Sequence, residues 1–515
     1  MNVRSINLEN PLLVKELRSR MRGAKAYWML FAYLTILSLA LLIAYFSWWS
    51  ARRYSGEAFV IGRTFFQTLF FVQVGLVCLI APGLTSGCIT IEKEQRTFDL
   101  LAVTSMTARS MVAGKLVSAM SFVLLLIVSS LPLVSVCFLL GGVSPGEVFF
   151  AYLILLLAAF LYGSIGLMWS SVARNTSTAT LATYGSVMGI FYFTAILGFP
   201  FMGAGVLKAV NPATAFLYSV TPEKYFGFLM PAWIPSLVLN GLGGMLLAMI
   251  SVRRIDSYAA DESVGLRVQS LLLYFAVLFF VFGGIFGAWQ WREAKDYQQS
   301  FLMATSCLIL SFLLAAIPVY ATGEPAKRSN RGLPELLLYG WRRIFRSTVE
   351  SSIPFISLLI IVGLAISLLG FPLSRLSPPS NLASQMMPML LVIISVSAAW
   401  SLVAILLSYL LRSRWPALAS TYLIMVVFTV LPLMTLTSWR PGFSGQHNPL
   451  WLTLYANPYL ALIDAYSTDL NTLPDPSGHW IPYAPITFCF YVLIALLAAV
   501  WLRHILRNEN TKLAG

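Results

Sequence analysis

Residues 64–84 read TFFQTLFFVQVGLVCLIAPGL, and residues 91–101, close behind them, read IEKEQRTFDLL. An apolar run of about 20 residues is long enough to cross the roughly 30 Å hydrocarbon core of a bilayer as a helix. Each charge placed near the bilayer centre would cost about 2.5–3.5 kcal/mol, so the charged stretch must lie outside the hydrocarbon. We therefore predict a membrane-spanning helix followed by a short charged helix, which is suited to contact with a soluble partner.

The composition places the whole chain in the membrane class. Of its 515 residues, 58% are hydrophobic and only 10% are charged, whereas soluble domains carry about 25% charged residues. The net charge of +14 comes from short basic segments between apolar runs, not from one basic face with aromatic residues beside it. This distribution argues against a nucleic-acid partner and leaves membrane lipids as expected partners.

Apolar runs of membrane-spanning length recur along the chain and predict an all-α polytopic membrane protein with about twelve transmembrane helices in two six-helix halves. The runs of the first half are at 27–49, 59–87, 115–140, 147–172, 180–202 and 231–252. Those of the second half are at 269–290, 301–321, 353–371, 385–411, 415–437 and 485–503. With the N-terminus inside, most of the 34 Lys and Arg residues fall in inside segments. The positive-inside rule therefore places both termini and the charged stretch in the cytoplasm.

The segment before the first span predicts an amphipathic interfacial helix. Leu13, Leu17 and Met21 are spaced four residues apart, and basic residues surround them. This spacing puts the three apolar side chains on one face of a helix that would lie on the inner membrane surface. An ordinary basic flank is the alternative. We assign residues 1–26 to this helix.

Two matching sequence patterns suggest that the second half repeats the first. Arg174, Ala179, Thr183 and Tyr184 match Arg412, Ala417, Thr421 and Tyr422 at identical spacing, and an Asn-Pro pair precedes the last span of each half at Asn211 and Asn457. The predicted modules are therefore 27–255, with a coupling region at 88–115, and 256–515, with a long outer loop at 438–484. The alternative is one module followed by an unrelated six-helix extension.

Several chemistries are missing from the sequence. The chain has no phosphate-binding Gly-x-x-x-x-Gly-Lys-Ser/Thr motif, and its five cysteines and three histidines show no metal-ligand spacing. The Gly-x-Ser-x-Gly match at 142–146 has no histidine near it and predicts a plain turn. Asp and Glu are scarce in the predicted spans, which argues against an ion-coupled carrier.

The charged stretch resembles the coupling region of ABC type-2 exporter permeases. The resemblance rests on the charged cluster, a threonine, a leucine step and the Gly-Lys pair that opens the third span: Glu92, Lys93, Glu94, Thr97, Leu100, Leu101, Gly114 and Lys115. Two residues depart from the family pattern, because Arg96 stands where glycine is common and Ser105 where proline is usual. The resemblance covers about residues 10–255, and the amphipathic segment resembles the family's interfacial helix.

This resemblance implies a permease subunit in a bacterial plasma membrane, not an enzyme by itself. A separate ABC ATP-binding subunit would bind ATP and magnesium, and this chain would bind no cofactor or metal. The coupling residues would be the matched set together with Arg96 and Asp99. A second, eroded contact with an ATPase is predicted at Glu324, Glu335 and Leu336, where a solvated or headgroup-facing segment is the alternative. A second permease chain is a further partner if the second half is not a module.

Two other functions remain open at this point: a secondary carrier with two six-span halves, and a membrane scaffold that transports nothing. Neither accounts for a charged helix between the second and third spans. The sequence does not identify a transported substrate: lipids, drugs, peptides and polysaccharides all remain possible, because no polar cluster in the predicted spans selects among them.

Overall fold

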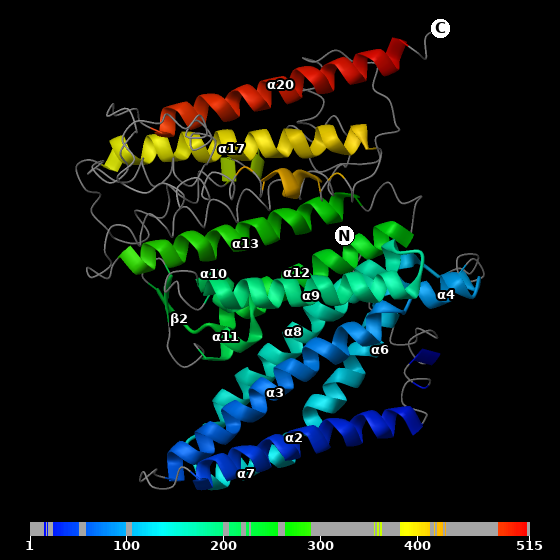
Figure 1. Ribbon diagram of the computed structural model, residues 1–515, viewed down its shortest axis with the longest axis vertical. Coiled ribbons are helices and arrows are strands. Elements are labelled where there is room, and N and C mark those ends of the chain that lie inside the picture. Colours follow the sequence, from blue (N-terminus) through cyan, green and yellow to red (C-terminus); the bar gives the residue numbers. More distant parts are fainter. Residues whose placement is uncertain are drawn as a thin grey trace, which may run out of the picture. The chain divides into compact units, whose positions relative to one another are not determined.

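The computed structural model (Figure 1) is helical through most of the residues that it describes. These residues are 15–16, 18, 24–50, 58–98, 106–198, 205–217, 223–225, 228–255, 263–289, 355, 358–359, 361–362, 382–411, 417, 420–425, 428 and 483–511. The chain divides into two compact units, Met1–Glu223 with Leu229–Glu262, and Lys224–Phe228 with Ser263–Gly515. The predicted module boundary at 255/256 lies close to this division, but the division does not make the second unit a repeat, which stays a prediction.

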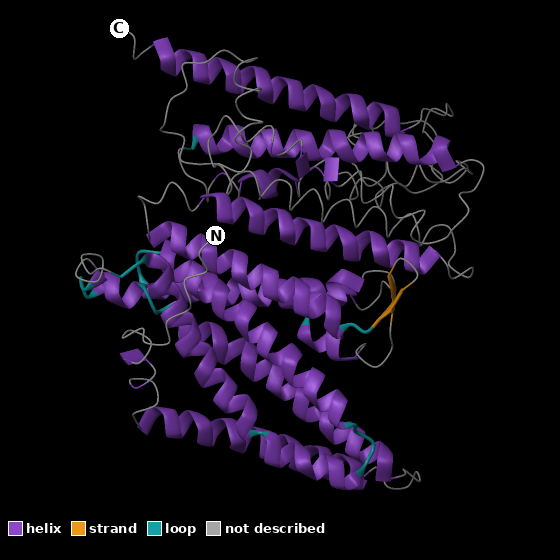
Figure 2. Cartoon of the chain, turned by 180° about the vertical axis from the view of Figure 1, so that it is seen from behind, coloured by secondary structure: helices purple, strands orange, loops and turns teal. Residues whose placement is uncertain are grey.

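The long helices of the first unit overlap the predicted apolar runs, and shorter elements lie between them. They are α2 (Ala24–Ser50), α3 (Ala58–Ser86), α4 (Thr90–Glu94), α6 (Ala108–Ser129), α7 (Leu131–Leu140), α8 (Pro145–Val172), α9 (Thr176–Gly198), α10 (Gly205–Val210), α11 (Pro212–Leu217) and α12 (Trp233–Ile255). Between α11 and α12, β1 (Glu223–Tyr225) and β2 (Phe228–Met230) pair as a two-stranded sheet, drawn in orange in Figure 2.

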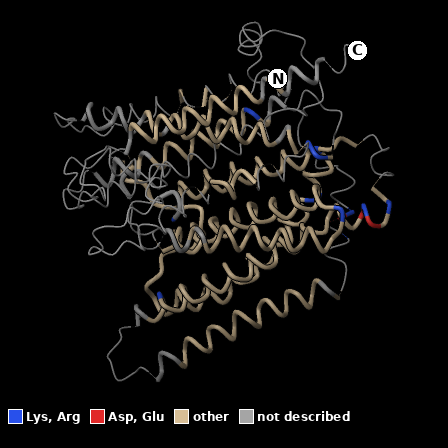
Figure 3. The backbone as a smooth tube through the Cα atoms, turned by 45° about the horizontal axis from the view of Figure 1, so that its top comes forward, with Lys and Arg blue, Asp and Glu red and all other residues tan. Residues whose placement is uncertain are grey.

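Within the described residues, five helices are long and apolar enough to cross a membrane. They span Ala26–Phe46, Ile61–Glu94, Ala108–Leu140, Pro145–Val172 and Trp233–Ile255. The predicted class, a helical integral membrane protein, is confirmed to this extent. In Figure 3 the long helices are almost entirely tan, and the charged residues of the described chain lie mainly at helix ends, as a hydrocarbon solvent requires.

Local sequence explains where α8 begins. The matched Gly-x-Ser-x-Gly segment runs from the connection after α7 into the first residues of α8, and Gly141 and Gly142 in this connection have φ of +82° and +85°, a region that glycine enters without steric cost. Ser144 then caps α8: its hydroxyl accepts a hydrogen bond from Glu147 N, while the Glu147 carboxylate accepts one from Ser144 N, both at 3.2 Å. Pro145 follows at the first helical turn, where its missing N–H is not needed.

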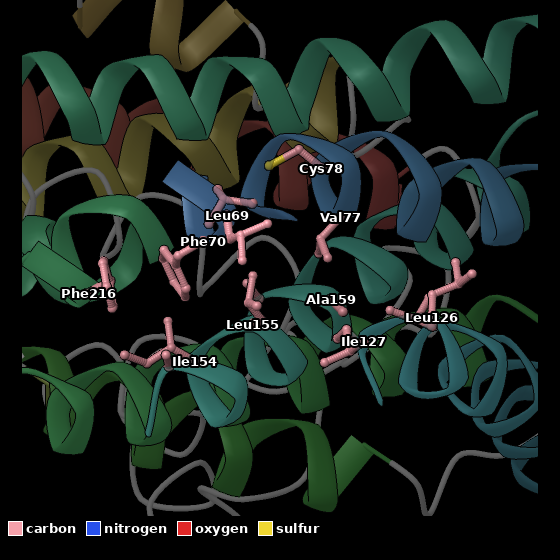
Figure 4. Close-up of a cluster of buried hydrophobic side chains, with 14 of the residues drawn as sticks. Leu69, Phe70, Val77, Cys78, Leu126, Ile127, Ile154, Leu155, Ala159 and Phe216 are labelled. Carbon is pink, nitrogen blue, oxygen red and sulfur yellow. The ribbon is translucent and has the colours of Figure 1, made fainter. Parts of the chain in front are cut away.

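Helix α8 is central to the first unit and contacts α3, α6, α9, α11 and α12. Figure 4 shows part of the core that results, with side chains contributed by α3, α6, α8 and α11. The Phe216 ring of α11 stacks on that of Phe70 of α3, with centroids 3.9 Å apart. The segment that precedes α12 therefore reaches the core. Buried Asn211, between α10 and α11, donates from Nδ2 to Phe191 O of α9 at 3.0 Å.

Small residues bring α3 and α8 close together. A Cβ added at Gly166 of α8 would collide with the Thr85 side chain and would lie 3.0 Å from Pro82 O and 3.1 Å from Ser86 N. Close backbone approach of this kind is how membrane helices gain packing energy, since lipid supplies no hydrophobic force between them.

The second unit contains α13 (Ser263–Trp289), α17 (Leu382–Leu410) and α20 (Tyr483–Thr511), which fall at three predicted spans. Trp400 of α17 and Tyr491 of α20 are buried together. The predicted span at 301–321 and nearly all of the loop at 438–484 lie outside the described residues. Thr183 and Thr421, paired in the proposed repeat, each donate a side-chain hydrogen bond to the alanine carbonyl four residues earlier, at 2.6 and 2.7 Å.

We predict that Gly166→Ala destabilises the protein by about 1–3 kcal/mol, since the new methyl group overpacks the contact between α3 and α8. Thermal unfolding of the purified full-length chain in detergent measures this effect. Gly75→Ala on α3 is the control, because nothing lies within 4 Å of its added Cβ. Equal unfolding temperatures for the two variants would contradict the close packing at Gly166.

Candidate functional site

The charged stretch forms a compact turn of helix directly after α3. The chain turns at residues 87–89, forms α4 over Thr90–Glu94 and ends this helix at Gln95 and Arg96. The predicted charged helix is therefore present but short. Asp99, Leu100 and Leu101, which belong to the predicted coupling set, lie outside the described residues.

Lys93 caps the end of α8. Its ammonium donates to three backbone carbonyls there, Ser171 O at 2.7 Å, Ala173 O at 3.2 Å and Ser170 O at 3.4 Å. The last carbonyls of a helix lack intrahelical partners and carry partial negative charge, so a lysine is favourable at this position.

Glu94, the next residue, caps the start of α9. Its carboxylate accepts hydrogen bonds from Thr176 N at 2.7 Å and from the Thr176 hydroxyl at 2.9 Å. A carboxylate is favourable there because the first N–H groups of a helix are unpaired and carry partial positive charge. Two adjacent residues of α4 thus hold both sides of the turn between α8 and α9.

Ser170 of α8 completes the connection in the opposite direction. Its hydroxyl accepts hydrogen bonds from Ile89 N at 2.9 Å and from Thr90 N at 3.1 Å, which satisfies unpaired N–H groups at the start of α4. Sequence reasoning missed Ser170 because nothing in its local pattern distinguishes it from any other serine in an apolar run.

Glu92 and Lys115 join α4 to α6. The Lys115 ammonium lies 2.6 Å from Glu92 Oε1 and 3.4 Å from Glu16 Oε1, and it donates to Cys88 O at 3.0 Å. Lys115 is 2% exposed, so its charge depends on these partners. Gly114, also in the predicted coupling set, is buried within α6. The interfacial segment that contains Glu16 therefore meets the charged stretch at this lysine.

Arg96 adopts a backbone conformation that is uncommon for a residue other than glycine. Its φ is +55°, in the left-handed region where glycine is favoured and other residues pay a steric cost of about 1–2 kcal/mol. The chain bends back here, and Thr97 N donates to Glu92 O at 3.0 Å. Arg96 and Thr97 are both exposed.

An exposed surface remains once these internal bonds are counted, and we call it the α4 face. It comprises Ile91, Gln95, Arg96 and Thr97 of the charged stretch and Arg174 and Asn175 of the turn between α8 and α9, all of them exposed. It offers an apolar side chain, two guanidinium groups and neutral polar groups. This chemistry suits binding to another macromolecule.

Two further predictions from the sequence concern a second contact with a partner and the absence of a metal site. Glu324, Glu335 and Leu336, the predicted second contact, lie outside the described residues. In the part of the chain that the structure describes, no group of three His, Cys, Asp or Glu side chains could hold a metal ion.

Comparison of the chain with protein-family models, with curated proteins and with solved structures finds no match.

We predict that Lys115→Met destabilises the protein strongly, because Glu92 would keep a largely buried carboxylate without its cation. Loss of one partner from a buried pair costs about 3–5 kcal/mol, and the 18% exposure of Glu92 places the expected loss at the lower end of this range. The double variant Glu92→Gln with Lys115→Met should recover part of the loss in a thermal unfolding assay. A double variant less stable than Lys115→Met alone would contradict this account.

Proposed function

We propose that this chain is the membrane-spanning permease subunit of an ATP-driven ABC exporter, energised by a separate ATP-binding subunit that docks on the α4 face. In this proposal the partner binds ATP and magnesium, and the chain itself catalyses no reaction. The α4 face lies in the cytoplasm, both termini are cytoplasmic, and the membrane is a bacterial plasma membrane. The basic bias of the predicted inside segments supports this orientation.

One observation carries the proposal: α4 is bonded to three long helices while its outer face stays exposed. Lys115 connects it to α6, Lys93 and Ser170 connect it to α8, and Glu94 connects it to α9. A displacement imposed on the α4 face by a partner is therefore passed to all three helices at once. Rigid-body movement of this kind is a common way for binding events to change a distant part of a protein.

The same contacts assign different roles to the residues of the charged stretch. Glu92, Lys93, Glu94 and Lys115 hold the face in place, and Arg96 and Thr97 with Ile91 present it to the partner. The two-module proposal follows from the repeat in the sequence: one chain with two modules would supply the whole membrane part. If the second half is not a module, two permease chains are required.

Arg96 offers a test that separates folding from partner binding. Arg96→Gly removes the guanidinium and also the steric cost of a positive φ, so its unfolding temperature should equal or exceed that of the wild type. Recovery of a Walker-motif ATPase with the tagged chain from gently solubilised membranes should fall at least several-fold, as expected for an interface arginine. ATP hydrolysis by the purified complex and identification of the partner by mass spectrometry are the measurements.

Arg63→Gln is the matched control, because Arg63 is an exposed arginine at the opposite end of α3. It should leave recovery of the ATPase unchanged. Failure to recover any ATPase with the wild-type chain would refute the proposed function and favour a secondary carrier or a scaffold. Equal recovery with Arg96→Gly and wild type would remove Arg96 from the interface.

A further inference from the structure

The predicted third span is broken near its middle, at Ser130. Helix α6 ends at Ser129 and α7 begins at Leu131. Pro132 has no N–H to donate to the carbonyl four residues earlier, and the ladder resumes when Leu133 N and Val134 N both donate to Ser130 O, at 3.0 and 3.2 Å. Breaks of this kind in membrane helices persist where side chains of neighbouring helices satisfy the polar groups around them.

The Ser130 hydroxyl is such a group, and its hydrogen-bonding capacity is full. Its oxygen lies 2.6 Å from Ile127 O, which can only accept, so the single hydroxyl hydrogen is donated there. Gln73 Nε2 of α3 donates to the same oxygen at 2.6 Å. Tyr152 Oη of α8 lies 2.8 Å away and must therefore be the donor. A serine hydroxyl has one hydrogen and two lone pairs, so no further donor can be accommodated.

Tyr33 of α2 has a hydroxyl donor that the filled Ser130 hydroxyl cannot accommodate. Tyr33 is 2% exposed, and its hydroxyl interacts with Ser130 and Gln73 without reaching ordinary hydrogen-bond geometry to either. A buried hydroxyl without a partner is costly and calls for a physical explanation. Helix α2 is also the least enclosed of the candidate spans. Among its described side chains only Tyr33 and Leu37 are buried.

We propose that Tyr33 and Tyr152 exchange as hydrogen-bond donors to Ser130, so that the break between α6 and α7 has two alternative arrangements. In the arrangement seen here the junction is bonded to α8, and in the other it is bonded to α2. The exchange replaces one tyrosine bond with another, so the two arrangements differ little in hydrogen bonding. A pair of discrete states of this kind is what a conformational transition requires. The proposal goes beyond the proposed function, since it depends on no partner and no substrate.

Hydrogen–deuterium exchange at the amides of Leu133 and Val134 measures how often their hydrogen bonds to Ser130 O open. The experiment uses the full-length protein in lipid nanodiscs. Tyr33→Phe and Tyr152→Phe should each change the exchange rate less than about two-fold, because the other tyrosine remains as donor. The double variant should raise the rate by roughly three- to ten-fold, the range expected for a lost interhelical hydrogen bond. Ser130→Ala should match the double variant.

Ser129→Ala is the matched control. The Ser129 hydroxyl also donates to the carbonyl three residues earlier, Leu126 O at 2.6 Å, but within the described residues this bond joins it to no other helix. It should leave the exchange rate unchanged. The proposal is overturned if the double tyrosine variant shows only the product of the two single effects, or if Ser129→Ala acts like Ser130→Ala. Unfolding temperatures close to wild type for the single phenylalanine variants exclude a general loss of structure.

Discussion

The arrangement of α4 depends on helix termini. A helix ends with carbonyls that lack donors, and the next helix begins with N–H groups that lack acceptors. Lys93 supplies the missing donor at the end of α8, and Glu94 supplies the missing acceptor at the start of α9. Because the two residues are adjacent, a single short helix satisfies both termini and fixes the turn between them. The positions of Arg96, Arg174 and Asn175 on the α4 face follow from this pairing.

Charged residues in a membrane protein are usually explained either by topology or by function. In the charged stretch, three of them also hold helices of the protein together. Lipid excludes these charges from the hydrocarbon, which decides where they lie. Three of them then find partners inside the protein: Glu92 at Lys115, Lys93 at the carbonyls of α8 and Glu94 at Thr176. A sequence that looks like a surface for charge–charge recognition is in large part an internal scaffold. The surface available for recognition is the α4 face, which combines other residues of the same stretch with Arg174 and Asn175.

The sequence predicts what the bilayer dictates. The runs at 59–87, 147–172 and 231–252 correspond to α3, α8 and α12 within about three residues, because hydrocarbon thickness sets their length. The break at Ser130 was missed because the residues on both sides are apolar and a run of hydropathy continues through it. Gln73, Ser130 and Tyr152 are far apart in sequence and meet only after packing, so no local pattern indicates the polar group that they form. A short helix is present in the charged stretch, as predicted, but its contacts with α8 and α9 join residues about 80 positions apart, which no local pattern reveals.

This separation has a consequence for how the protein is made. Lys93 and Glu94 leave the ribosome long before their partners, because the end of α8 and the start of α9 lie 77–82 residues later. At about 5–20 residues per second, that interval lasts several seconds. Throughout it, α3 is complete but the termini that its charged extension will satisfy do not yet exist. The contacts of Lys93 and Glu94 therefore form only after α8 and the start of α9 have been synthesised, and their formation marks the point at which these helices have packed against α4.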